Sequence, residues 1–187
     1  MDNVSTVADS ATATTHTKAA AQRAEHLAIL GVGKVLELCV GPSLKTLQQQ
    51  YAAHNIHCVG NDIDRRWEKY YKAGQWRIGD CLSVDWTGVD AVVFAPPLSR
   101  GCSGTREDAL RVSEVFPAYT AFLQEWSRRG PDTAVLVLPA RSLATQQDRR
   151  EYRQLLYLLS EMGICSVEPV ELVVGCRKYV DLYLTRY

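Results

Sequence analysis

The sequence has no long hydrophobic segment, no surplus of charge and no cysteine pair of the kind that binds zinc. No apolar run approaches the ~18 residues needed to cross a bilayer, so we expect no membrane-spanning helix and no membrane partner. Lysine plus arginine and aspartate plus glutamate both number 21, and such a balance gives no general attraction to nucleic acid. The six cysteines are scattered without a C-x-x-C pair, which predicts free thiols and no metal site.

Residues 1–17 lack the features of a secretory signal. They contain Asp2 and Asp9 but no basic start and no apolar centre, and they are rich in serine, threonine and alanine. This composition predicts a disordered leader, with an organellar targeting segment as the alternative. Residues 18–187 show no internal repeat and are enough for a single domain with a substantial core. We therefore expect one domain over residues 18–187 in a cytoplasmic protein.

Short apolar strands alternate with helical segments along the chain. Strands are expected at 34–39, 57–62, 76–80, 90–94 and 133–139. Helices are expected at 18–30, 44–53, 65–72, 106–128 and 148–162, with Pro117 kinking or splitting the fourth. Residues 165–174 and 177–187 are expected to form an antiparallel hairpin. This order predicts an α/β three-layer sandwich with a mostly parallel seven-stranded sheet that ends in the hairpin.

The segment after the first strand does not suit a dinucleotide. Ligands of open α/β sheets bind beyond the carboxyl ends of the strands. A dinucleotide fold uses G-x-G-x-x-G there, because pyrophosphate must lie against bare backbone. Those three positions are Cys39, Gly41 and Leu44 here, so only one of them is glycine. The phosphate interpretation is therefore disfavoured.

Carboxylates follow the second and third strands. Asp62 comes 21 positions after Gly41, where its carboxylate can accept hydrogen bonds from both hydroxyls of a ribose. Asp64 is expected to cap the next helix instead. Asp80 can accept from an adenine amino group, with Cys81 or the following residue supplying backbone contacts. These residues predict a nucleoside site.

The segment V-L-E-L-C-V-G-P-S, at positions 35–43, resembles the first motif of class I S-adenosylmethionine-dependent methyltransferases. The resemblance covers residues 18–187, including the terminal hairpin. Glu37 matches the acidic residue of that motif and Gly41 its middle glycine, whereas Cys39 and Ser43 replace the outer glycines. It implies a Rossmann-like methyltransferase fold and S-adenosyl-L-methionine as cofactor. The cofactor-binding residues that it implies are Glu37, Cys39, Gly41, Asp62, Ile63, Asp80, Cys81 and Ala95.

The segment F-A-P-P-L-S, at positions 94–99, forms a rigid corner at the end of the fourth strand. In family members that methylate exocyclic amines or glutamine amides, this strand ends in Asp/Asn-Pro-Pro-Tyr/Phe. There, the polar residue and the following carbonyl hold the amino group, and the aromatic ring stacks on it. Here, Ala95 and Leu98 replace the polar and aromatic residues. The corner predicts a catalytic set of Ala95, Pro96, Pro97, Arg100 and Glu107, with Arg100 binding an anionic group and Glu107 accepting a proton or opening a helix.

The leading functional prediction is a methyltransferase that uses S-adenosylmethionine and acts on a small anionic molecule or a protein side chain. A nucleic-acid methyltransferase is the first alternative; the proline corner supports it and the neutral charge balance weighs against it. It predicts a basic strip formed by Arg65, Arg66, Arg100, Arg106 and Arg141. A non-catalytic cofactor-binding module is the second alternative, supported by Ala95 and Leu98. The oligomeric state stays open.

Overall fold

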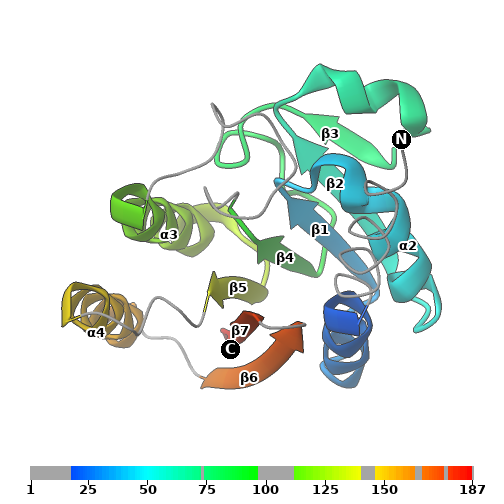
Figure 1. Ribbon diagram of the computed structural model, residues 1–187. Coiled ribbons are helices and arrows are strands. Elements are labelled where there is room, and N and C mark those ends of the chain that lie inside the picture. Colours follow the sequence, from blue (N-terminus) through cyan, green and yellow to red (C-terminus); the bar gives the residue numbers. More distant parts are fainter. Residues whose placement is uncertain are drawn as a thin grey trace, which may run out of the picture.

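A mixed sheet forms the centre of the molecule. The computed structural model describes residues 18–72, 74–96, 112–139, 146–162, 166–174 and 177–186. Its strands are β1 (Lys34–Leu38), β2 (His57–Asp62), β3 (Trp76–Ile78), β4 (Ala91–Phe94), β5 (Thr133–Pro139), β6 (Ser166–Val174) and β7 (Arg177–Thr185). They lie in the order β3-β2-β1-β4-β5-β7-β6 (Figure 1). The first five strands pair in parallel, whereas β7 is antiparallel to both β5 and β6. The predicted mostly parallel sheet with a terminal antiparallel hairpin is confirmed.

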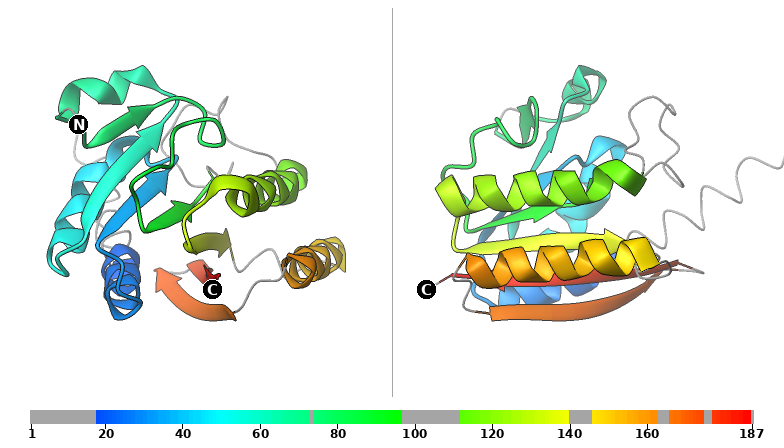
Figure 2. Two further views of the ribbon diagram at one scale, coloured as in Figure 1. Left: turned by 180° about the vertical axis from the view of Figure 1, so that it is seen from behind. Right: turned by 90° about the vertical axis from the view of Figure 1, so that its left-hand side faces the viewer.

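Helices cover both faces of the sheet. A helix over residues 18–29 and α2 (Leu44–Ala52) lie on one face, and α3 (Val112–Arg129) and α4 (Gln146–Glu161) lie on the other (Figures 1 and 2). The predicted α/β sandwich of three layers is therefore present. None of the helices in the described ranges combines the length and apolar character that crossing a bilayer requires.

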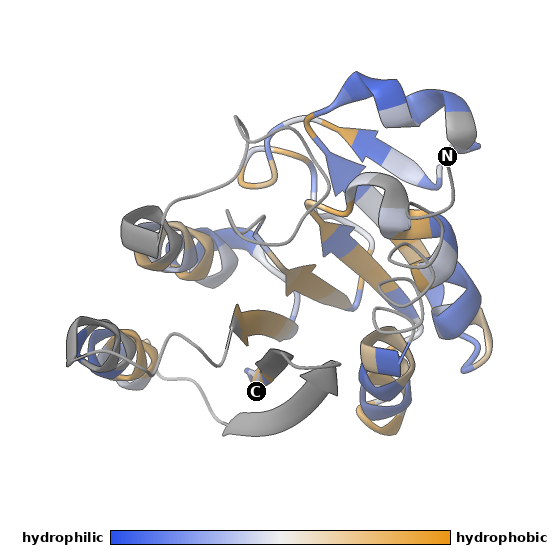
Figure 3. Cartoon of the chain, viewed as in Figure 1, coloured by the Kyte–Doolittle hydropathy of each residue, from blue (hydrophilic) through white to orange (hydrophobic). Residues whose placement is uncertain are grey.

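Alternation along the strands builds a core on each face of the sheet. In β1, Leu36 and Leu38 belong to the cluster under α3 and α4, whereas Val35 belongs to the cluster under α2 and residues 18–29. Successive side chains of a strand point to opposite faces, so strands buried on both faces become almost continuously apolar. Figure 3 shows this apolar character in the central strands. Glu37, which shares the face of Val35, is the charged exception and is 2% exposed.

Several elements differ from the prediction by one or two residues at their ends, and the third strand ends at Ile78 instead of residue 80. Three of the differences have a clear local reason. The first strand ends at Leu38 because Cys39 adopts a φ of 60°. The fourth begins at Ala91 because the carboxylate of Asp90 accepts from the amides of Gly33 and Lys34 (2.9 and 2.8 Å). The predicted helix at 65–72 is instead a 3₁₀ helix, η2 (Arg65–Tyr70). It ends where Tyr71 becomes extended and stacks on Trp76, with ring centroids 5.0 Å apart.

Candidate functional site

The strand ends that carry the predicted ligand residues lie at one edge of the sheet. β3, β2, β1 and β4 are neighbours and run parallel, so their carboxyl ends face the same way (Figure 1). The chain passes from β1 to β2 on one side and later returns to β4 on the other, which makes β1 the switch point where open α/β sheets bind ligands. The residues gathered there are Cys39, Gly41, Asp62, Ile63, Asp80, Cys81, Ala95 and Pro96.

The turn after β1 has the backbone of a glycine-rich loop. Cys39 has a φ of 60° and Gly41 a φ of 51°, both in the left-handed region. This backbone conformation costs roughly 1–2 kcal/mol for any residue that has a Cβ, but not for glycine. Gly41 leads into the 3₁₀ turn η1 (Gly41–Ser43), and a Cβ on it would lie 3.9 Å from the carboxylate of Asp62. Cys39 therefore has left-handed backbone at a position where the resembled motif has glycine.

Asp62 joins the end of β2 to this turn. Its Oδ2 accepts from the amide of Gly41 at 2.8 Å, and its Oδ1 accepts from the amide of Asp64 at 2.9 Å. A carboxylate offers about four lone-pair sites, so both oxygens keep acceptor capacity. Asp64 caps η2 by accepting from the amide of Arg66 at 2.9 Å, as the sequence predicted.

Ile63 and Asp80 present an apolar and an anionic surface at the same edge. Ile63 is 69% exposed although it is a large aliphatic residue. Asp80 is also exposed, and its Oδ1 accepts from the amide of Leu82 at 2.8 Å. An exposed aliphatic side chain and carboxylates at the same edge of the sheet suit a flat, partly polar ligand such as a nucleoside.

Two arginines hold the loop that follows β3. Arg129, the last residue of α3, donates to the carbonyls of Leu82 and Val84 at 2.6 and 2.8 Å. Its guanidinium also lies 4.5 Å from the ring centre of Trp86. Arg77 of β3 donates to the carbonyls of Asp85 and Thr87. The loop bearing Asp80 and Cys81 is therefore fixed from two sides.

The thiols of Cys39 and Cys81 meet between the ends of β1 and β3. The interaction between them raises the pKa of Cys39 and lowers the pKa of Cys81; burial reinforces the first shift and opposes the second. Asp62 and Asp80 are close enough to raise the pKa of Cys39 further. These four side chains thus form one cluster. No group of three or more potential ligands in the described residues is arranged to hold a metal ion.

The left-handed backbone at Cys39 gives a testable order of stabilities. We expect the Cys39→Gly protein to unfold with a free energy about 1 kcal/mol higher than the Cys39→Ala protein, because only glycine adopts this φ without a Cβ penalty. Urea unfolding measures the difference. Cys58, buried within β2, is the matched control, and there the glycine protein should be the less stable by about 0.5–1 kcal/mol. The same order at both positions would contradict the assignment of strain to Cys39.

Glu37 belongs to a buried network below the site. Its carboxylate accepts from the hydroxyl of Tyr51 and from Nη1 of Arg23, the latter at 3.4 Å. Arg23 also donates to both oxygens of Asp181 in β7, at 2.7 and 3.2 Å. Burial raises the pKa of Glu37, and Arg23 and Tyr51 oppose that rise. The resemblance predicts a cofactor-binding role for Glu37. The structure supplies Arg23 and Tyr51, so a cofactor contact of Glu37 stays a prediction.

The proline corner is described only at its start. Ala95 is half-buried and Pro96 is buried, both directly after β4. Pro97, Arg100 and Glu107 lie outside the described residues, and their catalytic roles stay predictions. The same holds for Leu98, Arg106 and Arg141.

Several residues that support the site were missed by the sequence analysis. They are Arg23, Tyr51, Arg77, Arg129 and Asp181. None follows a strand on the ligand side, and their partners are distant in the chain. Arg23 and Asp181, for example, are 158 positions apart. A charged residue amid the apolar residues of β7 was the one signal that pointed to Asp181.

Comparison with known proteins gives matches by structure alone. No family model and no curated protein matches the sequence. Magnesium protoporphyrin IX methyltransferase from Synechocystis PCC 6803 with bound SAH matches with a TM-score of 0.63 and 12% identity, over 100% of this chain and 90% of that chain. The methyltransferase domain of bacterial CtHen1-CN matches with a TM-score of 0.60 and 12% identity, over 92% and 100%. The hMettl16 catalytic domain in complex with the MAT2A 3′UTR hairpin 6 matches with a TM-score of 0.57 and 10% identity, over 89% and 69%.

Proposed function

We propose that this chain, which has the fold of class I S-adenosylmethionine-dependent methyltransferases, binds S-adenosyl-L-methionine at the ends of β1 to β4 and transfers its methyl group to an acceptor. The observation that carries the proposal is the hydrogen bond from the amide of Gly41 to Asp62. It fixes a carboxylate beside the turn at the switch point of the sheet, where a ribose diol is to be held. Solved proteins of this fold contain SAM or SAH, which supports the same cofactor here.

The charges and hydrogen-bonding groups of the residues at the site support this cofactor. Asp62 is assigned to the ribose hydroxyls and Asp80 to the adenine amino group, each with acceptor capacity left after its backbone contact. The exposed side chain of Ile63 is assigned to a face of the adenine ring. The amides around Cys39 and Gly41 are assigned to the amino acid end. Because the cofactor carries no phosphate, the loss of the outer glycines is tolerated.

The chain's role in the reaction is mainly to position the two reactants. The bound cofactor supplies an electrophilic methyl group on a sulfonium. Pro96, buried after β4, restricts the backbone and sets the direction of the neighbouring carbonyl toward an acceptor. Ala95 adds no acceptor or base of its own, so orientation and exclusion of water are the means of acceleration at the corner. The roles proposed for Pro97, Arg100 and Glu107 in holding the acceptor and accepting its proton complete this set.

The class of molecule that accepts the methyl group is a separate question. The sequence favoured a small anionic molecule or a protein side chain, on the basis of arginines that lie outside the described residues. The nucleic-acid alternative has support from described residues, because exposed cations follow Asp62 in η2. A non-catalytic module that binds the cofactor stays the alternative if no acceptor is methylated.

Cofactor titration of an Asp62 variant tests the site. Asp62→Ala is expected to weaken S-adenosylmethionine binding by about 1–3 kcal/mol, or roughly 5- to 150-fold, the size of a lost charged hydrogen-bond partner. Isothermal calorimetry measures this. Asp64→Ala, which removes the cap of η2, is the matched control and should change the affinity less than twofold. If the unaltered protein shows no heat of binding at millimolar S-adenosylmethionine, the proposal is wrong. Equal losses of affinity in both variants would mean that Asp62 is not the ribose ligand.

A further inference from the structure

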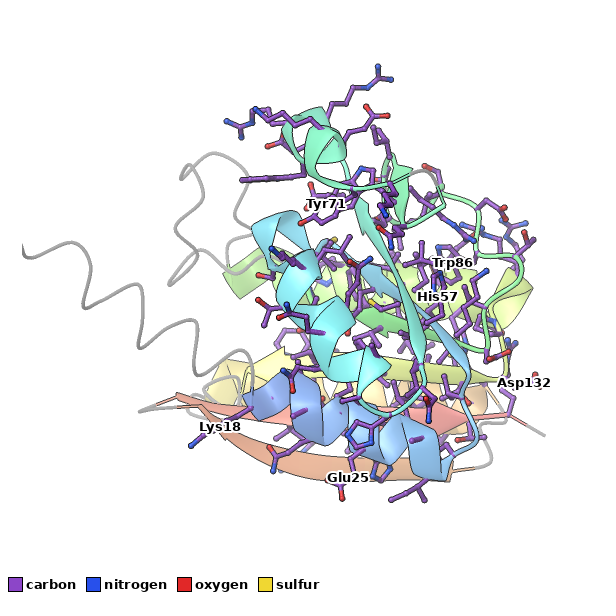
Figure 4. The ribbon with its side chains drawn as sticks, turned by 90° about the vertical axis from the view of Figure 1, so that its right-hand side faces the viewer. Lys18, Glu25, His57, Tyr71, Trp86 and Asp132 are labelled. Atoms are coloured by element: carbon purple, nitrogen blue, oxygen red, sulfur yellow. The ribbon has the colours of Figure 1, made fainter. Side chains whose placement is uncertain are left out.

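A local surplus of positive charge lies beside Asp62. The exposed cations are Lys45 at the start of α2, then Arg65, Arg66, Lys69 and Lys72 in and after η2. The carboxylates among these cations are Asp64, which is paired with Arg66, and Glu68, and Asp62 precedes them. Arg65, Lys69, Lys72 and Lys45 therefore outnumber the remaining carboxylates. Because the whole chain carries no net charge, this surplus is a property of one surface and not of the protein. Figure 4 shows long side chains extending outward from η2 at the edge of the molecule.

The surface is held in place by its inner side. Asp64 caps η2 at one end, and at the other Tyr71 stacks on Trp76 with a centroid distance of 5.0 Å. Tyr71 is half-buried and lies beneath η2 in Figure 4. Burial raises its pKa, and the backbone of Lys45 opposes part of that rise. The cations of η2 are therefore presented by a segment anchored to both β3 and α2.

We propose that this basic surface, formed by Lys45, Arg65, Arg66, Lys69 and Lys72, binds the phosphate backbone of a single-stranded nucleic acid. The inference rests on the proposed function and names the class of the acceptor. A 3₁₀ helix rises about 2 Å per residue, so the six residues of η2 extend about 12 Å. A nucleic-acid strand stacked as in a duplex carries one phosphate per about 3.4 Å, so the surface spans at most about three to four phosphates.

The position of the surface leads a bound strand toward the methyl-transfer point. η2 follows Asp62 at the end of β2, and the proline corner follows β4, two strand positions away. Neighbouring strands are about 4.8 Å apart, which places the two strand ends about 10 Å from each other. The end of β2, from which the chain continues into η2, therefore lies within a few nucleotides' length of the end of β4, which precedes Ala95.

The same surface favours nucleic acid over an acidic protein. Trp67, which lies among the cations of η2, is partly exposed. Indole rings next to cations are typical of single-strand sites, where bases stack while phosphates pair with arginine and lysine. A site for acidic side chains has no need of a ring surface at this position.

Fluorescence anisotropy with labelled 20-nucleotide oligouridylate and oligothymidylate tests the proposal. At 0.1 M salt, the triple variant Arg65→Gln/Lys69→Gln/Lys72→Gln is expected to bind either probe at least ~10-fold more weakly. Its plot of log K against log salt should be shallower by about 2, because each lost phosphate contact removes about 0.7 from the slope. Arg66 is retained because its amide and guanidinium hold Asp64. Thermal unfolding verifies that the variant is folded.

The matched control removes three exposed cations elsewhere, by Lys18→Gln/Arg150→Gln/Arg153→Gln, and should leave the affinity within twofold. Equal losses in both triples, or no binding of either probe at ~0.1 mM protein and low salt, overturn the proposal. Competition by polyglutamate as strong as that by unlabelled oligouridylate assigns the surface to an acidic protein and also overturns it. A preference for one probe tells RNA from DNA. Calorimetry with S-adenosylmethionine is run in parallel, so a failed cofactor site is distinguished from a failed nucleic-acid surface.

Discussion

Replacing Arg23 with methionine is expected to lower the free energy of unfolding by about 3–5 kcal/mol at pH 8, because it leaves buried carboxylates without their cation. Arg23 is 6% exposed, and it contacts Glu37 (2% exposed) and Asp181 (0% exposed). Its own pKa lies well above the usual value, because the two carboxylates outweigh the lowering effect of burial. Urea unfolding of both proteins measures the loss.

The loss should shrink as the pH falls. Burial already raises the pKa of Glu37 above that of the unfolded chain, so the folded state binds more protons and becomes relatively more stable below that raised pKa. Arg23 lowers the pKa of Glu37, so its removal raises the pKa of Glu37 in the folded state further. The folded state of the variant therefore gains stability from protonation of Glu37 at a higher pH than the unaltered protein does. We therefore expect a smaller difference between the two proteins at pH 5 than at pH 8.

Two further variants separate charge from packing. Arg23→Lys keeps the cation and should lose less than the methionine variant, although lysine cannot bridge both carboxylates as a guanidinium does. The triple variant Arg23→Met/Glu37→Gln/Asp181→Asn removes all three charges and should recover at least half of the loss, since a neutral set avoids unpaired buried charge. A loss below about 1 kcal/mol, or a larger loss at pH 5, would falsify the electrostatic account.

The sheet was predictable because its signal is local. Apolar runs bounded by glycine, proline and aspartate place β1 to β5 within one or two residues, and the alternation in residues 177–187 predicts the hairpin. The placement of Gly41, Asp62 and Asp80 follows from the parallel order of the strands, since side chains after parallel strands meet at one edge. The left-handed backbone at Cys39 is also consistent with the sequence, because the resembled motif has glycine at this position.

The supports of the site were not predictable because they depend on the completed fold. Glu37 reads as a ligand residue in the sequence, yet its described partners come from a helix 14 positions before it and a helix 14 positions after it. Nothing in the local pattern distinguishes Arg129 from Arg128, which precedes it on α3 and contacts the same Glu125. Only the packing of α3 on the sheet decides which of the two arginines meets the loop after β3.

Because only Arg129 contacts the loop after β3, alanine variants of Arg129 and Arg128 are expected to differ strongly in stability. Arg129→Ala is expected to lower the free energy of unfolding by about 2–4 kcal/mol, since a hydrogen bond to a charged group contributes about 1.5–3 kcal/mol and a cation–π contact about 0.5–1. It removes the donors to Leu82 and Val84 and the contact with Trp86. Arg128→Ala removes a 69% exposed partner of Glu125 and should change the free energy by less than about 0.5 kcal/mol.

Hydrogen exchange distinguishes a loosened loop from a generally weakened protein. In Arg129→Ala, the amides of residues 80–88 should exchange faster than in the unaltered protein under conditions where the strands β1 and β4 keep their protection. Because Asp80 and Cys81 lie on this loop, S-adenosylmethionine should bind about 10-fold more weakly, and excess ligand should restore the protection. Arg129→Lys keeps the charge but not the two-carbonyl fork, so it should recover stability only in part. Uniformly faster exchange, or an equal effect in Arg128→Ala, would show that Arg129 stabilises the helix and not the loop, and the adenine side of the proposed site would then lose its positioning residue.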